Sequence, residues 1–164
     1  TFDKAVAEFA VGYAAITDLS EESPHDGVAT YKITLAGAGA PEEVNGTKQV
    51  ETAEVVGTIS TAGNATFTVT AAGMTGSPKA VNVAVALGDS AAVVAQKARE
   101  TLAADNAVTA KFSVGGYGTM VELTALTAAA NDATLNIAIA NGTCAGLTAA
   151  PTSENTTAGV APAA

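Results

Sequence analysis

The chain has 164 residues and a formal net charge of −9, from 7 Lys and Arg against 16 Asp and Glu. This length allows one or two small domains, and an acidic chain without a basic cluster excludes a nucleic-acid partner, because phosphates require a positive surface. Hydrophobic residues make up 48% of the chain, but aromatic residues only 4%, and Trp is absent. We therefore expect a thin core of small side chains that partner subunits help to stabilise.

The first segment carries large apolar side chains at alternating steps of four and three residues. They are Phe2, Val6, Phe9, Tyr13 and Ile16. This spacing predicts an amphipathic helix over residues 2–16, which packs either on its own domain or on a neighbouring subunit. In the second case these five residues form the candidate interface.

Two loops and a strand are predicted after this helix. Residues 17–27 are acidic and rich in turn formers, which predicts a loop. Residues 27–37 alternate with a period of two, which predicts a strand with one buried face. Residues 38–49 have the composition of a mobile loop, so we expect an N-terminal attachment segment over 1–49 and a β-rich domain over 50–164.

The second part of the chain is mainly β in pattern. Period-two segments and the turns between them predict strands over 50–61, 65–73, 79–88 and 133–142, and a hairpin over 108–126. Asp89 and Ser90 precede an apolar stripe of helical spacing and predict a capped helix over 90–105. The tail, 151–164, is predicted as a loop. The order β-β-β-α-β-β-β predicts an α+β fold, a mainly antiparallel β domain with one crossing helix, preceded by the N-terminal helix and strand.

Residues capable of chemistry are few and scattered. His25 and Cys144 are the only histidine and the only cysteine, and neither has partners nearby for a triad or a metal site. The acidic pairs Glu21–Glu22 and Glu42–Glu43 fall in turn-rich segments, where carboxylates point to water. Asn131–Asp132 is read as turn chemistry, with a calcium corner as the alternative. We therefore expect no enzymatic activity, no cofactor and no metal.

The sequence also lacks signals for a membrane or for export. No apolar run approaches the roughly 20 residues that a membrane-spanning helix needs. The first residues include Asp3 and Glu8, where a signal peptide would carry basic residues. We expect synthesis in the host cytoplasm and no membrane partner.

Three segments carry a resemblance to a known family. They are "AAGMTGSP" (71–78), "VNVAVALGDSAAVVAQKARETLAAD" (81–105) and "AANDATLNIAIANGT" (129–143). With their surroundings, over residues 55–160, they resemble a domain that recurs in structural proteins of tailed bacteriophages and their prophages. The first 50 residues carry no such resemblance.

The resemblance implies a non-enzymatic virion protein that self-associates and docks on the particle. Its partners would be copies of itself and other virion proteins, and its location the virion. Head decoration, or another role on the head surface, is favoured over a tail tube. A carbohydrate- or surface-binding β module is a further alternative, although sugar binding favours exposed Trp, which is absent.

Overall fold

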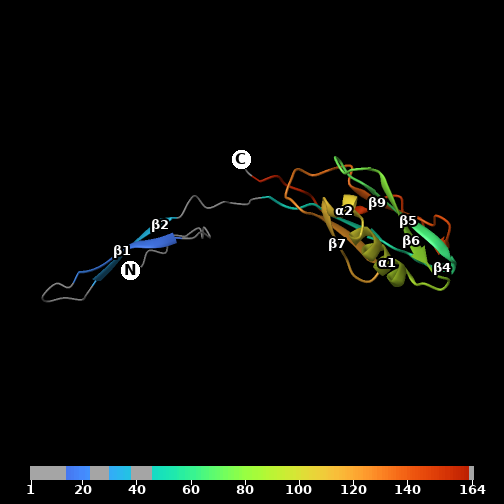
Figure 1. The fold of residues 1–164 in the computed structure, drawn as a ribbon, viewed down its shortest axis with the longest axis horizontal. Helices are drawn as coiled ribbons and strands as arrows, with labels where there is room; N and C mark the ends of the chain where they lie inside the picture. The colour runs from blue at the N-terminus through green and yellow to red at the C-terminus, as the bar shows by residue number, and fades with distance from the viewer. Residues whose placement is uncertain (1–13, 23–29, 38–45, 163–164) are drawn as a thin grey trace. The chain divides into compact units, whose positions relative to one another are not determined.

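The computed structural model describes residues 14–22, 30–37 and 46–162 (Figure 1), with side chains described over 46–162. The chain divides into two units, Thr1–Glu43 and Val44–Ala164, each of which is described by itself. The second unit begins inside the segment that the sequence predicts as a mobile loop.

The N-terminal unit contains one antiparallel strand pair, β1 (Ala14–Glu22) and β2 (Thr30–Gly37). Ile16 on β1 lies opposite Leu35 on β2, and the register shifts once, just after Ile16. The strand predicted over 27–37 is therefore confirmed where the structure describes it.

The predicted N-terminal helix is wrong over its last turn, because Ala14–Ile16 belong to β1. The predicted loop over 17–27 is likewise wrong over Thr17–Glu22. Pairing with β2 decides the extended conformation, and a helical spacing of apolar residues gives no sign of that partner. The other candidate interface residues lie outside the described part of the chain: Phe2, Val6, Phe9 and Tyr13.

The second unit contains a three-stranded antiparallel sheet in the order β6-β5-β9. Its strands are β5 (Gly63–Thr70), β6 (Lys79–Val85) and β9 (Asn136–Ala140). Alternate residues are buried, as the period of two predicts. The buried members are Ala65, Phe67, Val69, Val81, Val83, Val85, Ile137 and Ile139. These three predicted strands are confirmed.

A four-stranded antiparallel sheet has the order β11-β3-β8-β7. Its strands are β3 (Val50–Glu54), β7 (Phe112–Gly115), β8 (Met120–Ala125) and β11 (Glu154–Thr157). The β7–β8 hairpin is confirmed, but the predicted tail loop over 151–164 is wrong at β11. Every β11 side chain is exposed, so no apolar alternation marks this strand, which is held by backbone pairing with β3 and by side-chain bonds of Asn155 and Thr156.

The predicted strand over 50–61 is broken in two. Its second half, β4 (Gly57–Thr61), leaves the four-stranded sheet and pairs with β10 (Ala145–Leu147). Gly57 and Gly146 both have a φ of +115°. A Cβ atom on Gly57 would collide with the Gly146 carbonyl oxygen, so this crossing requires glycine.

One long helix, α1 (Ala91–Ala103), crosses the domain and packs against β6, β7 and β8 (Figure 1). Its buried face is that predicted from the sequence: Val94, Ala98 and Leu102, with Ala95. Ser90 takes the N-cap position without a side-chain hydrogen bond, whereas Asp89 accepts from the Ala86 amide and from Lys97. A short helix that the sequence did not predict, α2 (Asn106–Thr109), follows.

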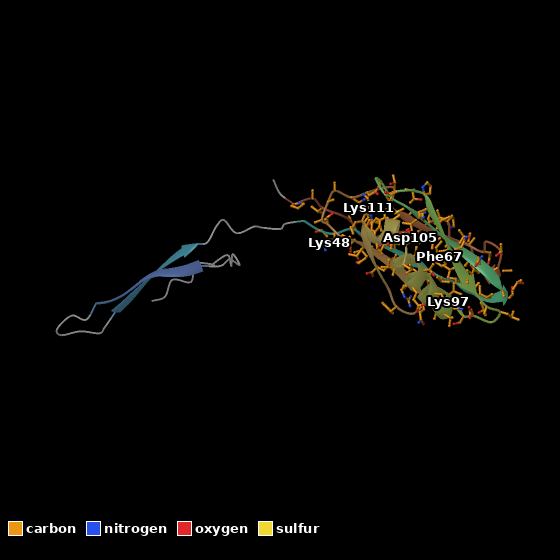
Figure 2. The ribbon with its side chains drawn as sticks, viewed as in Figure 1. Lys48, Phe67, Lys97, Asp105 and Lys111 are labelled. Carbon is orange, nitrogen blue, oxygen red and sulfur yellow. The ribbon has the colours of Figure 1, made fainter. Side chains whose placement is uncertain are left out.

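The sheets and α1 enclose one apolar core built largely from valine and alanine. Phe67 is completely buried and lies inside this body (Figure 2), and Phe112 is 6% exposed. The described fold is α+β and mainly antiparallel, with one crossing helix, as predicted.

Candidate interaction surface

Of the five residues predicted as an interface, the structure describes only Ile16. It lies on β1, opposite Leu35, rather than on a helix. The other four lie outside the described residues, so the predicted interface stays a prediction, and the described surface of the second unit is considered next.

The exposed side of the β6-β5-β9 sheet, which we call the outer face, is made only of small uncharged side chains. Its members are exposed or half-exposed: Thr66, Thr68, Thr70, Ala80, Asn82, Ala84, Asn136, Ala138 and Ala140. The register places them in rows across the sheet, with Thr68 between Ala80 and Ala138. In a chain of charge −9, this face carries no ionisable group.

Most sheet edges in the described second unit are short or covered. On the far side of β9, Ile139 and Ala150 exchange two backbone hydrogen bonds of 2.7 and 3.0 Å. On the far side of β4, Ile59 bonds to the backbone of Gly88 and Asp89. Strands β7 and β11 have four residues each, and the register of β11 is irregular.

The edge of β6 differs from all of these, and we call residues 79–85 the β6 edge. Strand β6 pairs with β5 through seven consecutive residue pairs without a register shift. Among the described residues, no backbone group bonds to its other side. Its only charged residue is Lys79, at one end. A long, regular and apolar free edge is a template for pairing with another strand.

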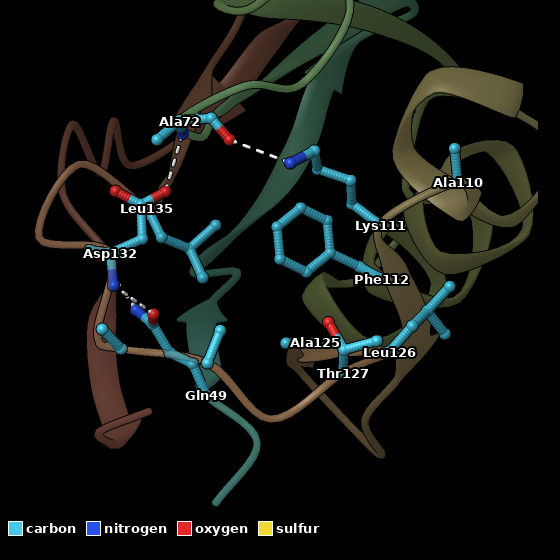
Figure 3. A pocket seen from close by; sticks show the side chains of 12 residues that line it. Gln49, Ala72, Ala110, Lys111, Phe112, Ala125, Leu126, Thr127, Asp132 and Leu135 are labelled. Carbon is cyan, nitrogen blue, oxygen red and sulfur yellow. Dashed lines mark hydrogen bonds between the residues drawn. The ribbon is translucent and has the colours of Figure 1, made fainter. Parts of the chain in front are cut away.

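One cavity in the described residues, of about 480 Å³, is mostly apolar. Figure 3 shows Phe112 and Leu135 in its wall and two charged side chains, Lys111 and Asp132, that both reach Ala72. Lys111 Nζ donates to the Ala72 carbonyl oxygen at 3.1 Å, and Asp132 Oδ2 accepts from the Ala72 amide at 2.7 Å. Both charged groups hold a loop in place.

Asp132 has a structural role that matches its reading as turn chemistry. Its other oxygen, Oδ1, accepts from the amide and hydroxyl of Thr134. The Gln49 side chain donates to the Asp132 carbonyl oxygen and accepts from the Asp132 amide (Figure 3). Burial raises the pKa of this carboxyl, but the hydrogen bonds from Thr134 and Ala72 outweigh burial, so its pKa lies below the usual value. The carboxylate is fully occupied by protein donors.

One carboxyl group, Glu51 on β3, is buried. It is 3% exposed, and its Oε1 accepts from the Ser153 hydroxyl at 2.6 Å. Its Oε2 has no hydrogen-bond partner among the described residues. Burial is the main reason that the pKa of Glu51 is raised; the bond from Ser153 opposes this shift, and nearby Glu154 adds to it. Ser153 also accepts from the Ile137 amide at 2.8 Å, so the cluster ties the tail to the sheet.

The other candidates for chemistry remain isolated. Cys144 is buried, its thiol donates to the Asn141 carbonyl oxygen, and burial raises its pKa, as expected of a packed thiol. His25 and Glu42–Glu43 lie outside the described residues, and Glu21–Glu22 end β1. Among the residues searched, no three His, Cys, Asp or Glu side chains could together hold a metal ion. None of the described helices has the length and apolarity needed to cross a bilayer.

The β6 edge and the outer face were missed at the level of sequence, although the strand itself was predicted. The sequence pattern predicted a strand over 79–88, but only the pairing order shows that β6 ends its sheet. Comparison of the chain with protein-family models, with curated proteins and with solved structures finds no match.

Proposed function

We propose that this chain is a non-enzymatic structural protein of a bacteriophage virion, which acts by self-association and by docking on the particle. Within the virion we favour head decoration or another position on the head surface. The partners would be copies of the chain and other virion proteins.

The observation that carries the proposal is the outer face with its free β6 edge. Small side chains lose little conformational entropy when another surface covers them, and the uncharged face needs no ion pairs to be desolvated. An exposed sheet face of small side chains suits contact with another protein surface, whereas small ligands are bound in concave sites. The resemblance of residues 55–160 to phage structural domains supports the same function.

Electron microscopy of the purified full chain tests the proposal. The protein is imaged alone and after mixing with capsids that lack it, from the phage or prophage that encodes it. We expect no ordered assembly beyond small oligomers from the protein alone and extra density at regular positions on the mixed capsids. Tubes formed by the protein alone would assign it to the tail instead. Absence from purified virions, checked by mass spectrometry, would overturn a virion role.

A specific observation favours the second candidate, a carbohydrate-binding module. Tyr117 lies in the β7–β8 turn between Gly116 and Gly118 and is 84% exposed. An exposed aromatic ring can stack on a sugar. A glycan array probed with the wild-type chain and with Tyr117→Ala tests this role, and an array without any hit removes it.

A further inference from the structure

We propose that the β6 edge pairs with the β6 edge of a second copy in antiparallel fashion, about a two-fold axis that passes at Asn82. The two sheets of three strands would then join into one sheet in the order β9-β5-β6-β6-β5-β9. This proposal names the surface used for self-association and, in that sense, rests on the proposed function.

The central five residues of the β6 edge are symmetric in sequence around Asn82. Residues 80–84 read Ala-Val-Asn-Val-Ala in both directions. In the two-fold register Asn82 faces the partner's Asn82, valines face valines and alanines face alanines. Antiparallel pairing allows a residue to face its own copy, and the side chains then meet partners of equal size on both faces of the sheet. This self-complementarity singles out a second copy of the chain as the occupant.

The side chain at the axis is suited to such a pair. Asn82 is exposed, and its Oδ1 accepts from Thr66 Oγ1 at 3.3 Å. Its amide nitrogen has no partner among the described residues. An amide group carries both donors and an acceptor, so two copies of Asn82 can bond to each other.

Charge favours the same place. Two copies of net charge −9 repel each other over most of their surfaces, but residues 79–85 contain no acidic group. The one cation, Lys79, already lies 3.4 Å from Asp105 of its own chain. In the two-fold register it faces the partner's Val85, so the two Lys79 side chains lie at opposite ends, about 20 Å apart.

The ends of the joined sheet explain why pairing stops at two copies. The far side of β9 is occupied by Ala150 and by the tail near Ser153. A pairing that uses the same strand twice is closed, and a covered outer edge leaves no place for a third copy in the same sheet. Beyond the end of β6, Leu87 is 71% exposed, and the register brings it close to the start of the partner's β6.

Disulfide cross-linking of the full-length chain tests the register. Asn82→Cys places two thiols opposite each other across the axis, within the distance of about 4.4–6.8 Å between Cα atoms that a disulfide needs. Ala80→Cys is the matched control, because its opposite residue is the partner's Ala84 and its own copy lies about 13 Å away. The buried Cys144 is present in both variants. We expect an efficiently formed disulfide dimer only for Asn82→Cys under mild oxidation.

A mixture of Ala80→Cys and Ala84→Cys proteins carrying tags of different length should form a mixed dimer. Equal yields of dimer from Asn82→Cys and Ala80→Cys would indicate random collision and overturn the proposal, as would no dimer from either.

Charge variants test the same pair without a covalent bond. Asn82→Asp places two like charges at the axis and should raise the dimer Kd about tenfold or more in sedimentation experiments. Mixing Asn82→Asp with Asn82→Lys should restore association. Ser113→Asp makes the same change in net charge at an exposed site on β7, outside the β6 edge and the outer face, and should leave the Kd unchanged. Unchanged association of Asn82→Asp, or an equal loss in Ser113→Asp, would overturn the pairing.

The two levels of the proposal can fail separately. If the protein decorates capsids but Asn82→Cys forms no dimer, β6 pairing is refuted and the proposed function stands. If Asn82→Cys forms the dimer but the protein is absent from virions, the virion role is refuted and β6 pairing stands.

Discussion

The two main sheets of the second unit are held in place in different ways. In the β6-β5-β9 sheet every second residue is buried against the core, and the opposite side consists of small exposed residues. In the β11-β3-β8-β7 sheet the central strand β3 is buried on both sides, with Glu51, Thr52 and Ala53 at 3, 8 and 3% exposure. Both sheets bond to the tail near Ser153, but only the second buries polar side chains of its own strands, Glu51 and Thr52.

This difference shows why one sheet offers a surface and the other does not. The polar sheet is joined to the tail by β11 and by the bond between Glu51 and Ser153, so its centre is enclosed by its own chain. The apolar sheet is complete after three strands, and it keeps a free edge at β6.

The largest expected effect comes from removing β3. A fragment of residues 46–164 retains both sheets and should unfold cooperatively on heating. A fragment of residues 55–164 lacks the strand between β8 and β11 and should show neither cooperative unfolding nor native circular dichroism. Cooperative melting of the shorter fragment at the same temperature would mean that the polar sheet does not depend on β3.

The apolar sheet is tested by Phe67→Ala. Phe67 is completely buried, so its truncation should lower the free energy of unfolding by about 3–5 kcal/mol in urea titrations. Thr68→Ala, the next residue on β5 and part of the outer face, should cost less than about 0.5 kcal/mol. Similar costs for the two variants would contradict the view that one side of this sheet supplies its stability.

A smaller effect is expected for Ser153→Ala. The Ser153 hydroxyl donates to Glu51 and accepts from the Ile137 amide, so both groups lose a partner in the variant. The free energy of unfolding should fall by about 1–3 kcal/mol. Ser113→Ala, at an exposed site on β7, is the control and should be nearly neutral. A neutral Ser153→Ala would show that the other bonds of the tail, such as β11 pairing and the Thr47–Val160 bridge, hold it without this hydroxyl.

The smallest effect is a change in pH dependence caused by Glu51→Gln. Burial raises the pKa of Glu51 in the folded state, so between its unfolded and folded pKa values the folded protein binds more protons. This group therefore makes the free energy of unfolding fall as pH rises through the raised pKa. Glutamine does not titrate, so the stability of Glu51→Gln relative to wild type should increase as pH rises above the ordinary glutamate pKa of about 4.

Glu54→Gln, at an exposed position on the same strand, is the control for this experiment. Urea titrations of both variants and wild type across the pH range then separate the loss of the buried carboxyl from the loss of one negative charge at an exposed site. A parallel pH dependence of Glu51→Gln and wild type would contradict the raised pKa.

How far the sequence predicted the structure depended on whether a strand faces the core. Phe67, Val83 and Ile137 belong to alternating patterns, and the strands that carry them were predicted. Glu154–Thr157 has no apolar side, so its strand was not predicted. The start of β1 was predicted as helix because the spacing of its apolar residues also fits a helix. The five predicted interface residues remain a prediction, except that Ile16 lies on a strand.

By itself, the sequence determined the α+β class, the positions of β5, β6 and β9, and the buried face of α1. These properties follow from local periodicity and residue size, because the positions that bury apolar area carry apolar side chains at regular intervals along the chain. Only the tertiary structure decided that β3 and β4 separate, that β11 joins β3, and that β6 remains at an edge. Backbone hydrogen bonds between strands are nearly independent of side-chain identity, so the sequence of one strand does not specify which neighbour it pairs with.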